Sequence, residues 1–247
     1  LKYAAELEDV TEGYFNISIG RIIDAWKSVI EQNDGQEVSS ETFEALMAEV
    51  EMLEVVEDGF ELKIENNQYF VRRKNAHVKL DLGALAKGYV TQKVEDYLKS
   101  KGVILYSISS GSSSIVVGKK SEGKFRIGLK NPIQVGNYGR VELEETGITT
   151  SGNYEQFFSY QGRRYHHIIS PKAPYLKQPA NFFHTVTLIG KNAGLLDAVS
   201  TALYSMPFET MKVWIETHHE AYGIEAIVFK TNAKIESILY GTTLEVY

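Results

Sequence analysis

The stretch that decides the fold is Asp81-Leu82-Gly83-Ala84-Leu85-Ala86-Lys87-Gly88-Tyr89. Alternation before it predicts a short strand over residues 78–80, and helical spacing after it predicts a helix over 85–101. Gly83 and Ala84 let a ligand approach the backbone, and the N–H groups that begin a helix attract an anion. Lys87 adds a positive charge there. Taken alone, the stretch is equally compatible with a tight strand-to-helix joint, because short glycine motifs often occur by chance.

Outside this stretch, helices alternate with segments that read as antiparallel hairpins. Apolar spacing predicts further helices over residues 17–31, 39–52, 195–206 and 208–218. Strands are expected over residues 60–65, 68–73, 104–108, 114–117, 125–129, 141–144, 147–151, 185–189, 226–230 and 235–240. The pattern predicts an α+β fold with a mostly antiparallel sheet and packed helices, in one domain over residues 1–247.

Two local features sharpen this picture. Ser39 and Ser40 are good N-cap candidates for the helix that follows them. In the helix over 85–101, the apolar residues fall on one face, and Gly102 is a suitable helix end. That face consists of Leu85, Tyr89, Val90, Val94, Tyr97 and Leu98.

Composition excludes several classes of protein. The formal net charge is -6, which argues against a nucleic-acid surface, because phosphate binding needs clustered Lys and Arg. The chain has no cysteine, so disulfides, thiolate metal sites and Cys nucleophiles are excluded. No apolar run approaches the roughly 20 residues that span a bilayer.

A second group of polar residues lies in the most apolar predicted helix. Asp197 and Thr201 are one turn apart and therefore share a face. A carboxylate and a hydroxyl suit a hard cation such as Mg²⁺, which prefers oxygen ligands. The alternative is an Asp stabilised by the helix dipole and a Thr that bonds back to a carbonyl. A charge in so apolar a helix needs a partner, because burial without one is costly.

A third group combines a small polar turn with a histidine pair. Residues 147–155 (GITTSGNYE) read as a strand that ends in the turn, and residues 165–171 (YHHIISP) carry His166 and His167. The pair offers two metal ligands with no evident third. Single histidines are more often satisfied by a nearby backbone group.

In order and spacing, these groups resemble the ApbE-type FAD:protein FMN transferases. The family patterns D-L-G-x-x-A-K-G-Y, T-S-G-x-Y-E and D-A-x-S-T-A-L are matched by residues 81–89, 150–155 and 197–203. Residues 165–171 match Y-x-H-I-I-D-P, except that Ser170 replaces the Asp. Residues 13–20 match G-x-F-D-x-T-x-G, with Asn16 and Ser18 at the Asp and Thr positions. Each motif is weak by itself, whereas the ordered set is specific and covers nearly the whole chain.

The resemblance implies a fold, an activity and a site. The fold is a T-fold-related ApbE domain, and the activity is the Mg²⁺-dependent transfer of FMN from FAD to a threonine of an acceptor flavoprotein, with release of AMP. The metal ligands would be the Ala84 carbonyl and the side chains of Asp197 and Thr201. FAD would lie against Lys87, Gly88, Ser151, Gly152 and His167. His167 would act as the proton acceptor, and His166 would be a bystander.

The sequence departs from the family pattern at two places. Gly111-Ser112-Ser113 stands where the family has Gly-Gly-Asn, and Ser170 stands where it has Asp in the loop before Pro179. Ser170 either orients His167 less well than an Asp would or caps the turn at Pro171.

Three other functions stay open at this point. They are an FAD pyrophosphatase with water as acceptor, a non-catalytic FAD-binding protein, and an unrelated α+β protein whose motifs are packing features. The resemblance also implies an extracytoplasmic lipoprotein. Because the chain begins with Leu1 rather than Met, we expect a leader or lipid anchor upstream, which would be its only link to a membrane.

Overall fold

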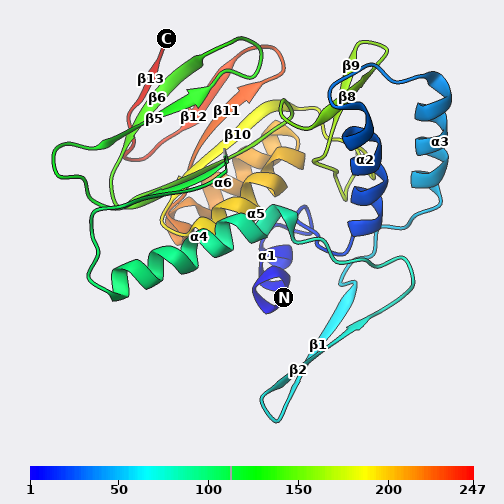
Figure 1. Cartoon of the computed structure of the whole chain (residues 1–247), viewed down its shortest axis with the longest axis horizontal. Helices are drawn as coiled ribbons and strands as arrows, with labels where there is room; N and C mark the ends of the chain where they lie inside the picture. The colour runs from blue at the N-terminus through cyan, green and yellow to red at the C-terminus, as the bar shows by residue number, and fades with distance from the viewer. Residues whose placement is uncertain (112) are drawn as a thin grey trace. The chain divides into compact units, whose positions relative to one another are not determined.

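A computed structural model describes residues 1–111 and 113–247 and confirms the α+β class (Figure 1). The chain forms two compact units. Unit 1 contains Leu1–Leu82 and Asn153–Asn181, and unit 2 contains Gly83–Gly152 and Phe182–Tyr247. Within the described residues, no helix combines the length and apolar character needed to cross a membrane. The single domain over residues 1–247 stays a prediction.

Unit 1 packs three helices with two small hairpins. Its elements are α1 (Lys2–Val10), α2 (Gly20–Asn33), α3 (Ser40–Glu51), β1 (Phe60–Glu65), β2 (Gln68–Arg73), β8 (Phe157–Tyr160) and β9 (Arg163–His166). Trp26 of α2 stacks on Phe158 and Tyr165, with ring centroids 6.1 and 5.9 Å apart. The predicted cap of α3 is confirmed, because the Ser39 side chain accepts a hydrogen bond from the Thr42 N–H.

The hairpin β1–β2 forms where the sequence predicts it. Asn66 and Asn67 both take positive φ, 49° and 62°, which a two-residue turn between antiparallel strands requires. Every residue of β2 is exposed. The hairpin extends as an arm from its unit (Figure 1).

Unit 2 is built on a six-stranded antiparallel sheet of order β12-β11-β10-β7-β4-β3. These strands are β3 (Ser107–Ser110), β4 (Ser114–Val117), β7 (Thr146–Gly152), β10 (Phe183–Gly190), β11 (Glu225–Lys230) and β12 (Ile235–Ile238). A second sheet has the order β13-β6-β5, formed by β5 (Phe125–Lys130), β6 (Asn137–Leu143) and β13 (Leu244–Val246). The helices are α4 (Gly83–Ser100), α5 (Ala193–Ser205) and α6 (Phe208–Tyr222).

Alternation along the strands gives the six-stranded sheet two different faces. Ile148, Ile189 and Ile227 belong to a core shared with Val141 and Leu143 of the second sheet. The intervening residues face α5, and on β4 and β7 they include the hydroxyl residues Ser114, Thr149 and Ser151. Polar groups are therefore delivered to the side of the sheet that α5 covers.

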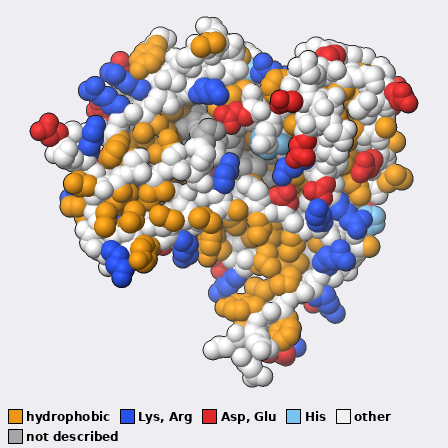
Figure 2. Space-filling model, in the orientation of Figure 1, with side chains coloured by type: hydrophobic (Ala, Val, Ile, Leu, Met, Phe, Trp, Pro, Cys, Tyr) orange, Lys and Arg blue, Asp and Glu red, His pale blue; other side chains and the backbone are white. Residues whose placement is uncertain are grey.

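The apolar face predicted for α4 is not the buried one. Leu85, Gly88, Thr91 and Glu95 are buried, whereas Tyr89, Val90, Val94 and Tyr97 are exposed. Hydrophobic side chains accordingly gather over α4 in Figure 2. Contact with α5 selects the buried side, because Gly88 allows closer approach than a face of tyrosines.

Other elements also differ from the sequence-based prediction. The strand expected over 78–80 is wrong, since only an isolated bridge between Ile19 and Lys79 forms there. Three further elements, α1, the hairpin β8–β9 and β13, were not predicted from the sequence. Strands as short as β9 and β13, with four and three residues, carry too little periodicity to be recognised, and their pairing comes from tertiary contacts.

Candidate functional site

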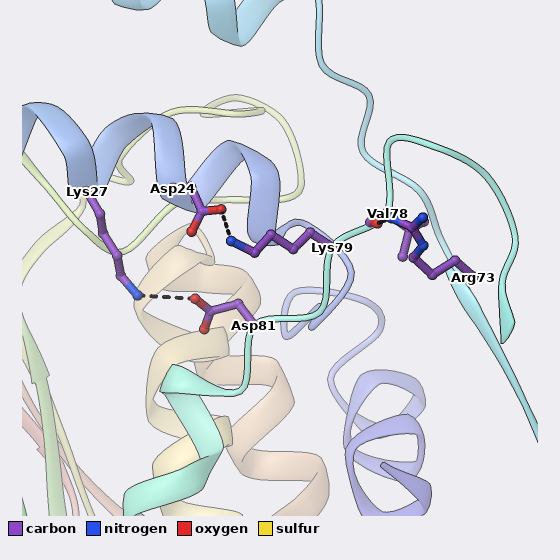
Figure 3. A network of polar contacts seen from close by, with 6 residues as sticks. All are labelled: Asp24, Lys27, Arg73, Val78, Lys79 and Asp81. Carbon is purple, nitrogen blue, oxygen red and sulfur yellow. Dashed lines mark hydrogen bonds and ion pairs between the residues drawn. The ribbon is translucent and has the colours of Figure 1, made fainter. Parts of the chain in front are cut away.

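The first residue of the decisive motif, Asp81, is anchored within unit 1. Its carboxylate pairs with Lys27 of α2, with 3.2 Å between Nζ and Oδ2 (Figure 3), and its N–H donates to the Ile17 carbonyl at 2.8 Å. Lys79 pairs with Asp24, and Arg73 donates to the Val78 carbonyl. These contacts hold the segment that leads into α4, so Asp81 acts as a structural anchor.

The crossing of α4 and α5 brings the predicted site residues of unit 2 together. The Gly88 N–H donates to the Asp197 carboxylate, with 2.8 Å between N and Oδ2. A Cβ at position 88 would lie 2.2 Å from the Ala193 carbonyl oxygen and 2.5 Å from Asp197 Cβ. Only glycine therefore permits this approach. This N–H therefore joins the α4 motif, which also carries the predicted ligand Ala84, to the predicted ligand Asp197 on α5.

The Asp197 carboxylate is buried, with only 5% of the residue exposed. Its second oxygen accepts from the Ser114 hydroxyl at 3.3 Å. Burial raises the pKa of this carboxyl above its ordinary value, opposed by the Gly88 hydrogen bond, the charge of Lys87 and the Ser114 hydroxyl. The environment therefore penalises the negative charge, and a cation beside the carboxylate would reverse that penalty.

Hydroxyl groups surround the third predicted ligand, Thr201. Its Oγ1 lies 3.3 Å from the Ser151 hydroxyl and 3.3 Å from the Asp197 carbonyl oxygen. Ser151 also contacts the Ser200 hydroxyl at 2.8 Å. Gly152, predicted to contact FAD, ends β7 next to Ser151 and pairs with Thr185 of β10. Thr201 and Ser151 are thus close together, while their roles toward metal and FAD stay predictions.

Lys87 points its ammonium group toward a hydroxyl residue that the sequence analysis did not assign to the site. Its Nζ lies 2.6 Å from the Ser113 Oγ, and the Ser113 carbonyl accepts from the Thr150 N–H at 2.8 Å. Ser113 belongs to the segment where the sequence departs from the family's Gly-Gly-Asn, and Ser112 lies outside the described residues. Ser113 and Ser114 were missed because serines outside a recognised motif carry no signal of their own.

The two histidines of unit 1 have different environments. His166 is buried, and its Nε2 donates to the Ala180 carbonyl at 2.7 Å while its Nδ1 accepts from the Ile168 N–H at 3.2 Å. Burial, with the neighbouring charge of His167, lowers the pKa of His166 to about 3. His166 is therefore a neutral structural residue.

His167 is only partly buried, and its Nδ1 lies 3.5 Å from the Gln156 carbonyl oxygen. When Nδ1 donates to this carbonyl, Nε2 is the nitrogen that can accept a proton. The role of His167 as proton acceptor stays a prediction.

Ser170, where the family pattern has Asp, closes a local turn. Its hydroxyl donates to the Lys172 carbonyl at 2.8 Å and accepts from the Lys172 N–H at 3.2 Å. The residue is fully buried. Both contacts are local, which favours the interpretation of Ser170 as a turn cap.

The donor set at Asp197 fits a hard divalent cation. Across the described part of the chain, no group of three or more His, Asp or Glu side chains is arranged to hold a metal. A cation at Asp197 would therefore take its remaining ligands from hydroxyl, carbonyl or phosphate oxygens, which is the ligand type that Mg²⁺ prefers.

Known proteins share both sequence and fold with this chain. FAD:protein FMN transferases of Rhodobacter capsulatus and Klebsiella pneumoniae (strain 342) are each 28% identical to it and match 82% and 81% of its length. The chain spans 37% and 59% of those two relatives. The ApbE protein of Thermotoga maritima has the same fold, with a TM-score of 0.77 at 24% identity over 96% of this chain and 73% of that one.

Another solved structure and a family model agree with these matches. The flavin transferase ApbE from Vibrio cholerae superposes with a TM-score of 0.69 at 23% identity, over 97% of this chain and 73% of that one. The model described as the ApbE family matches residues 1–228. This match removes the interpretation of the motifs as packing features of an unrelated protein. The chain belongs to the ApbE family.

Proposed function

We propose that this chain is an FAD:protein FMN transferase that uses Mg²⁺. The observation that carries the proposal is the buried Asp197 carboxylate, bonded to the Gly88 N–H and bordered by the Thr201 and Ser151 hydroxyls, in a chain that matches the ApbE family over residues 1–228. Relatives that are 28% identical to it, over 82% and 81% of its length, carry that name. The substrate is FAD, and the partner is an acceptor flavoprotein that presents a threonine.

In the proposed reaction, the threonine hydroxyl oxygen attacks the FMN-side phosphorus of the FAD pyrophosphate. A new P–O bond joins FMN to the threonine, the bond to the bridging oxygen breaks, and AMP leaves with the bond electrons. The hydroxyl proton passes to Nε2 of His167 and then to solvent. Such transfers depend mainly on positioning and charge stabilisation.

The protein's own groups have distinct tasks in this proposal. The Ala84 carbonyl and the side chains of Asp197 and Thr201 would hold Mg²⁺, which supplies charge stabilisation for the pyrophosphate oxygens when bound. Lys87 would hold negative charge on the nucleotide from the first turns of α4. Ser151 and Gly152 offer small surfaces where FAD can approach the backbone, whereas the space beside the predicted FAD contact Gly88 is filled by α5.

The proposal is tested by incubating the protein with FAD, Mg²⁺ and a threonine-bearing acceptor peptide, followed by mass spectrometry of the peptide and chromatography of AMP. We expect the peptide to gain FMN in step with AMP, and an alanine-substituted peptide to gain nothing. AMP and free FMN released without the peptide would identify a pyrophosphatase. FAD binding without AMP release would identify a binding protein, and no binding with or without Mg²⁺ would contradict the proposal.

The location of the protein is a separate proposal. The family resemblance motivates an extracytoplasmic, lipid-anchored protein. Fractionation of cells that express the full reading frame tests this, with a reporter enzyme active only outside the cytoplasm fused to the C-terminus. Recovery of the protein in the cytoplasmic fraction, without reporter activity, would contradict it.

A further inference from the structure

Two hydrogen bonds, one turn apart on each helix, cross from α4 to α5. In the first, the Gly88 N–H donates to the Asp197 carboxylate at 2.8 Å. In the second, the Ala193 N–H donates to the Gln92 side-chain oxygen, also at 2.8 Å. Positions 88 and 92 run forward along α4 while 197 and 193 run backward along α5, so the two bonds are rungs of an antiparallel crossing. Together they define the register of one helix against the other.

The hydrogen bonds matter for the register because the α4 residue that contacts α5 here, Gly88, has no side chain that could interlock with it. Gly88 presents no side chain to α5, and a Cβ there would collide with the Ala193 carbonyl. Interlocking side chains normally fix how far one helix can slide along another. A glycine contact lacks that interlock, so polar rungs take over the task.

The Gln92 amide is held in one orientation. Its Oε1 accepts from the Ala193 N–H, and its Nε2 donates to Glu95 Oε2 at 2.9 Å and to Asp96 Oδ1 at 3.0 Å. An N–H can only donate and carboxylates accept, so the reverse orientation would set like groups against each other on both sides.

Glu95, on the buried face of α4, holds the Gln92 amide in this orientation. It is 2% exposed, and its Oε1 accepts from the Tyr106 hydroxyl at 2.8 Å and from Lys99 Nζ at 2.8 Å. A buried carboxylate with this many partners is rigidly placed, because each lost bond would leave buried charge unsatisfied. Gln92 therefore sits on a fixed support.

At the start of α5, Gln92 accepts a hydrogen bond from the Ala193 N–H, which has no acceptor within the helix. The first N–H groups of a helix have no partner within it. The Asn192 side chain accepts from the Leu195 N–H at 3.0 Å, and Gln92 reaches across from α4 to accept from Ala193. The first turn of α5, one turn before Asp197, is thus capped by two different elements.

We propose that Gln92 is a positioning residue for the Mg²⁺ site, acting through Ala193 and the register of α5 to keep the Asp197 carboxylate at the Gly88 N–H and the Ala84 carbonyl. The metal part of this inference rests on the proposed function. The register part concerns the protein without metal. Groups that bond directly to metal ligands typically change metal affinity by about 10–100-fold when they are removed, and Gln92 acts one contact further out, through Ala193.

The test variant is Gln92→Met, which keeps the length of the side chain and removes the acceptor. Two quantities are measured well below the melting temperature. One is the Mg²⁺ affinity by calorimetric titration in the presence of FAD, and the other is the hydrogen-exchange rate of the Gly88 amide in metal-free protein. We expect an affinity about 10–100-fold weaker and faster exchange at Gly88, while saturating Mg²⁺ restores most of the AMP release.

Two control variants separate positioning from general destabilisation. Val199→Ala removes buried methyl groups of α5 and touches neither rung, so it should lower the melting temperature and leave both quantities unchanged. Lys93→Met removes an exposed charge 3.9 Å from Asp96 and leaves the Gln92 acceptor in place, so it should shift both quantities far less than Gln92→Met.

Three results would overturn the inference. One is a Gln92→Met variant with the same Mg²⁺ affinity and the same Gly88 exchange rate as the wild type, provided that the wild type binds Mg²⁺ measurably. Another is a Val199→Ala variant that shifts both quantities as much as Gln92→Met. The third is a wild-type protein that binds no Mg²⁺ with FAD, which would overturn the proposed function as well.

Discussion

The Gly88 N–H and the Asp197 carboxylate, 109 residues apart in sequence, meet at 2.8 Å where α4 crosses α5. This bond connects the motif that begins α4 with the most buried helix of the protein. It also places a carboxylate beside the turn that carries Ala84 and Lys87. The predictions below test the parts of this arrangement and the two histidines.

Gly88→Ala should separate the two helices. The new Cβ would lie 2.2 Å from a backbone carbonyl oxygen, which cannot move aside as a flexible side chain can. We expect a loss of about 1–3 kcal/mol in unfolding free energy, as for other overpacked sites, together with weaker Mg²⁺ binding. Urea unfolding and calorimetry measure the two effects.

Gly241→Ala is the matched control, because its Cβ would meet only the Glu225 side chain at 3.7 Å. It should leave both measurements unchanged. Equal losses in the two variants would show that the α4–α5 contact is not special.

Asp197→Asn should abolish Mg²⁺ binding and preserve the fold. The amide can still accept from the Gly88 N–H and donate to the Ser114 oxygen. Because the buried carboxylate carries a desolvation penalty, we expect the metal-free variant to be as stable as the wild type, or more stable by on the order of 1 kcal/mol. An unfolded variant alongside a wild type without metal affinity would make Asp197 purely structural.

The same substitution should change how stability depends on pH. The pKa of Asp197 is raised in the folded protein, so the folded state takes up a proton at a higher pH than the unfolded chain does. In metal-free buffer, the wild type should therefore gain stability relative to Asp197→Asn as the pH falls from 7 through this raised pKa toward 4. Urea unfolding at several pH values checks the sign, and a relative loss on acidification would contradict it.

The two histidines should separate stability from activity. The pKa of His166 is lowered to about 3, so its contribution to stability is complete above pH 6.5 and is lost as the pH falls from there toward 3. His166→Gln should cost about 1–3 kcal/mol of unfolding free energy at pH 7.5 and reduce the loss of stability on acidification.

His167→Gln should leave the unfolding free energy nearly unchanged and slow AMP release about 10²–10⁴-fold. The reverse assignment of effects would reject His167 as the base.

Ser170→Asp should not raise transfer activity. The buried hydroxyl both donates to and accepts from the backbone of Lys172, and a carboxylate can only accept. We expect a loss of about 1–3 kcal/mol in unfolding free energy, as for a buried polar group left without a partner, and an unchanged or lower rate of AMP release. A clear increase in that rate would instead support a role for this position in orienting His167.

Several local features of this protein follow directly from its sequence. Asn66-Asn67 tolerate positive φ and so define the β1–β2 turn, and Ser39 caps α3 because its side chain reaches the Thr42 N–H. An almost wholly apolar α5 has to be buried wherever it packs. The ordered motifs identify the family, since they record which residue types the site requires.

Only the tertiary structure decided which faces and hydroxyls meet. Periodicity on α4 favoured the face of Val90 and Tyr97, yet α5 buries the face of Gly88 and Glu95. Ser114 reaches Asp197 only because β4 pairs with β7 beneath α5. A local pattern specifies an element and its period, whereas the choice of partner depends on the packing of segments that lie far apart in sequence.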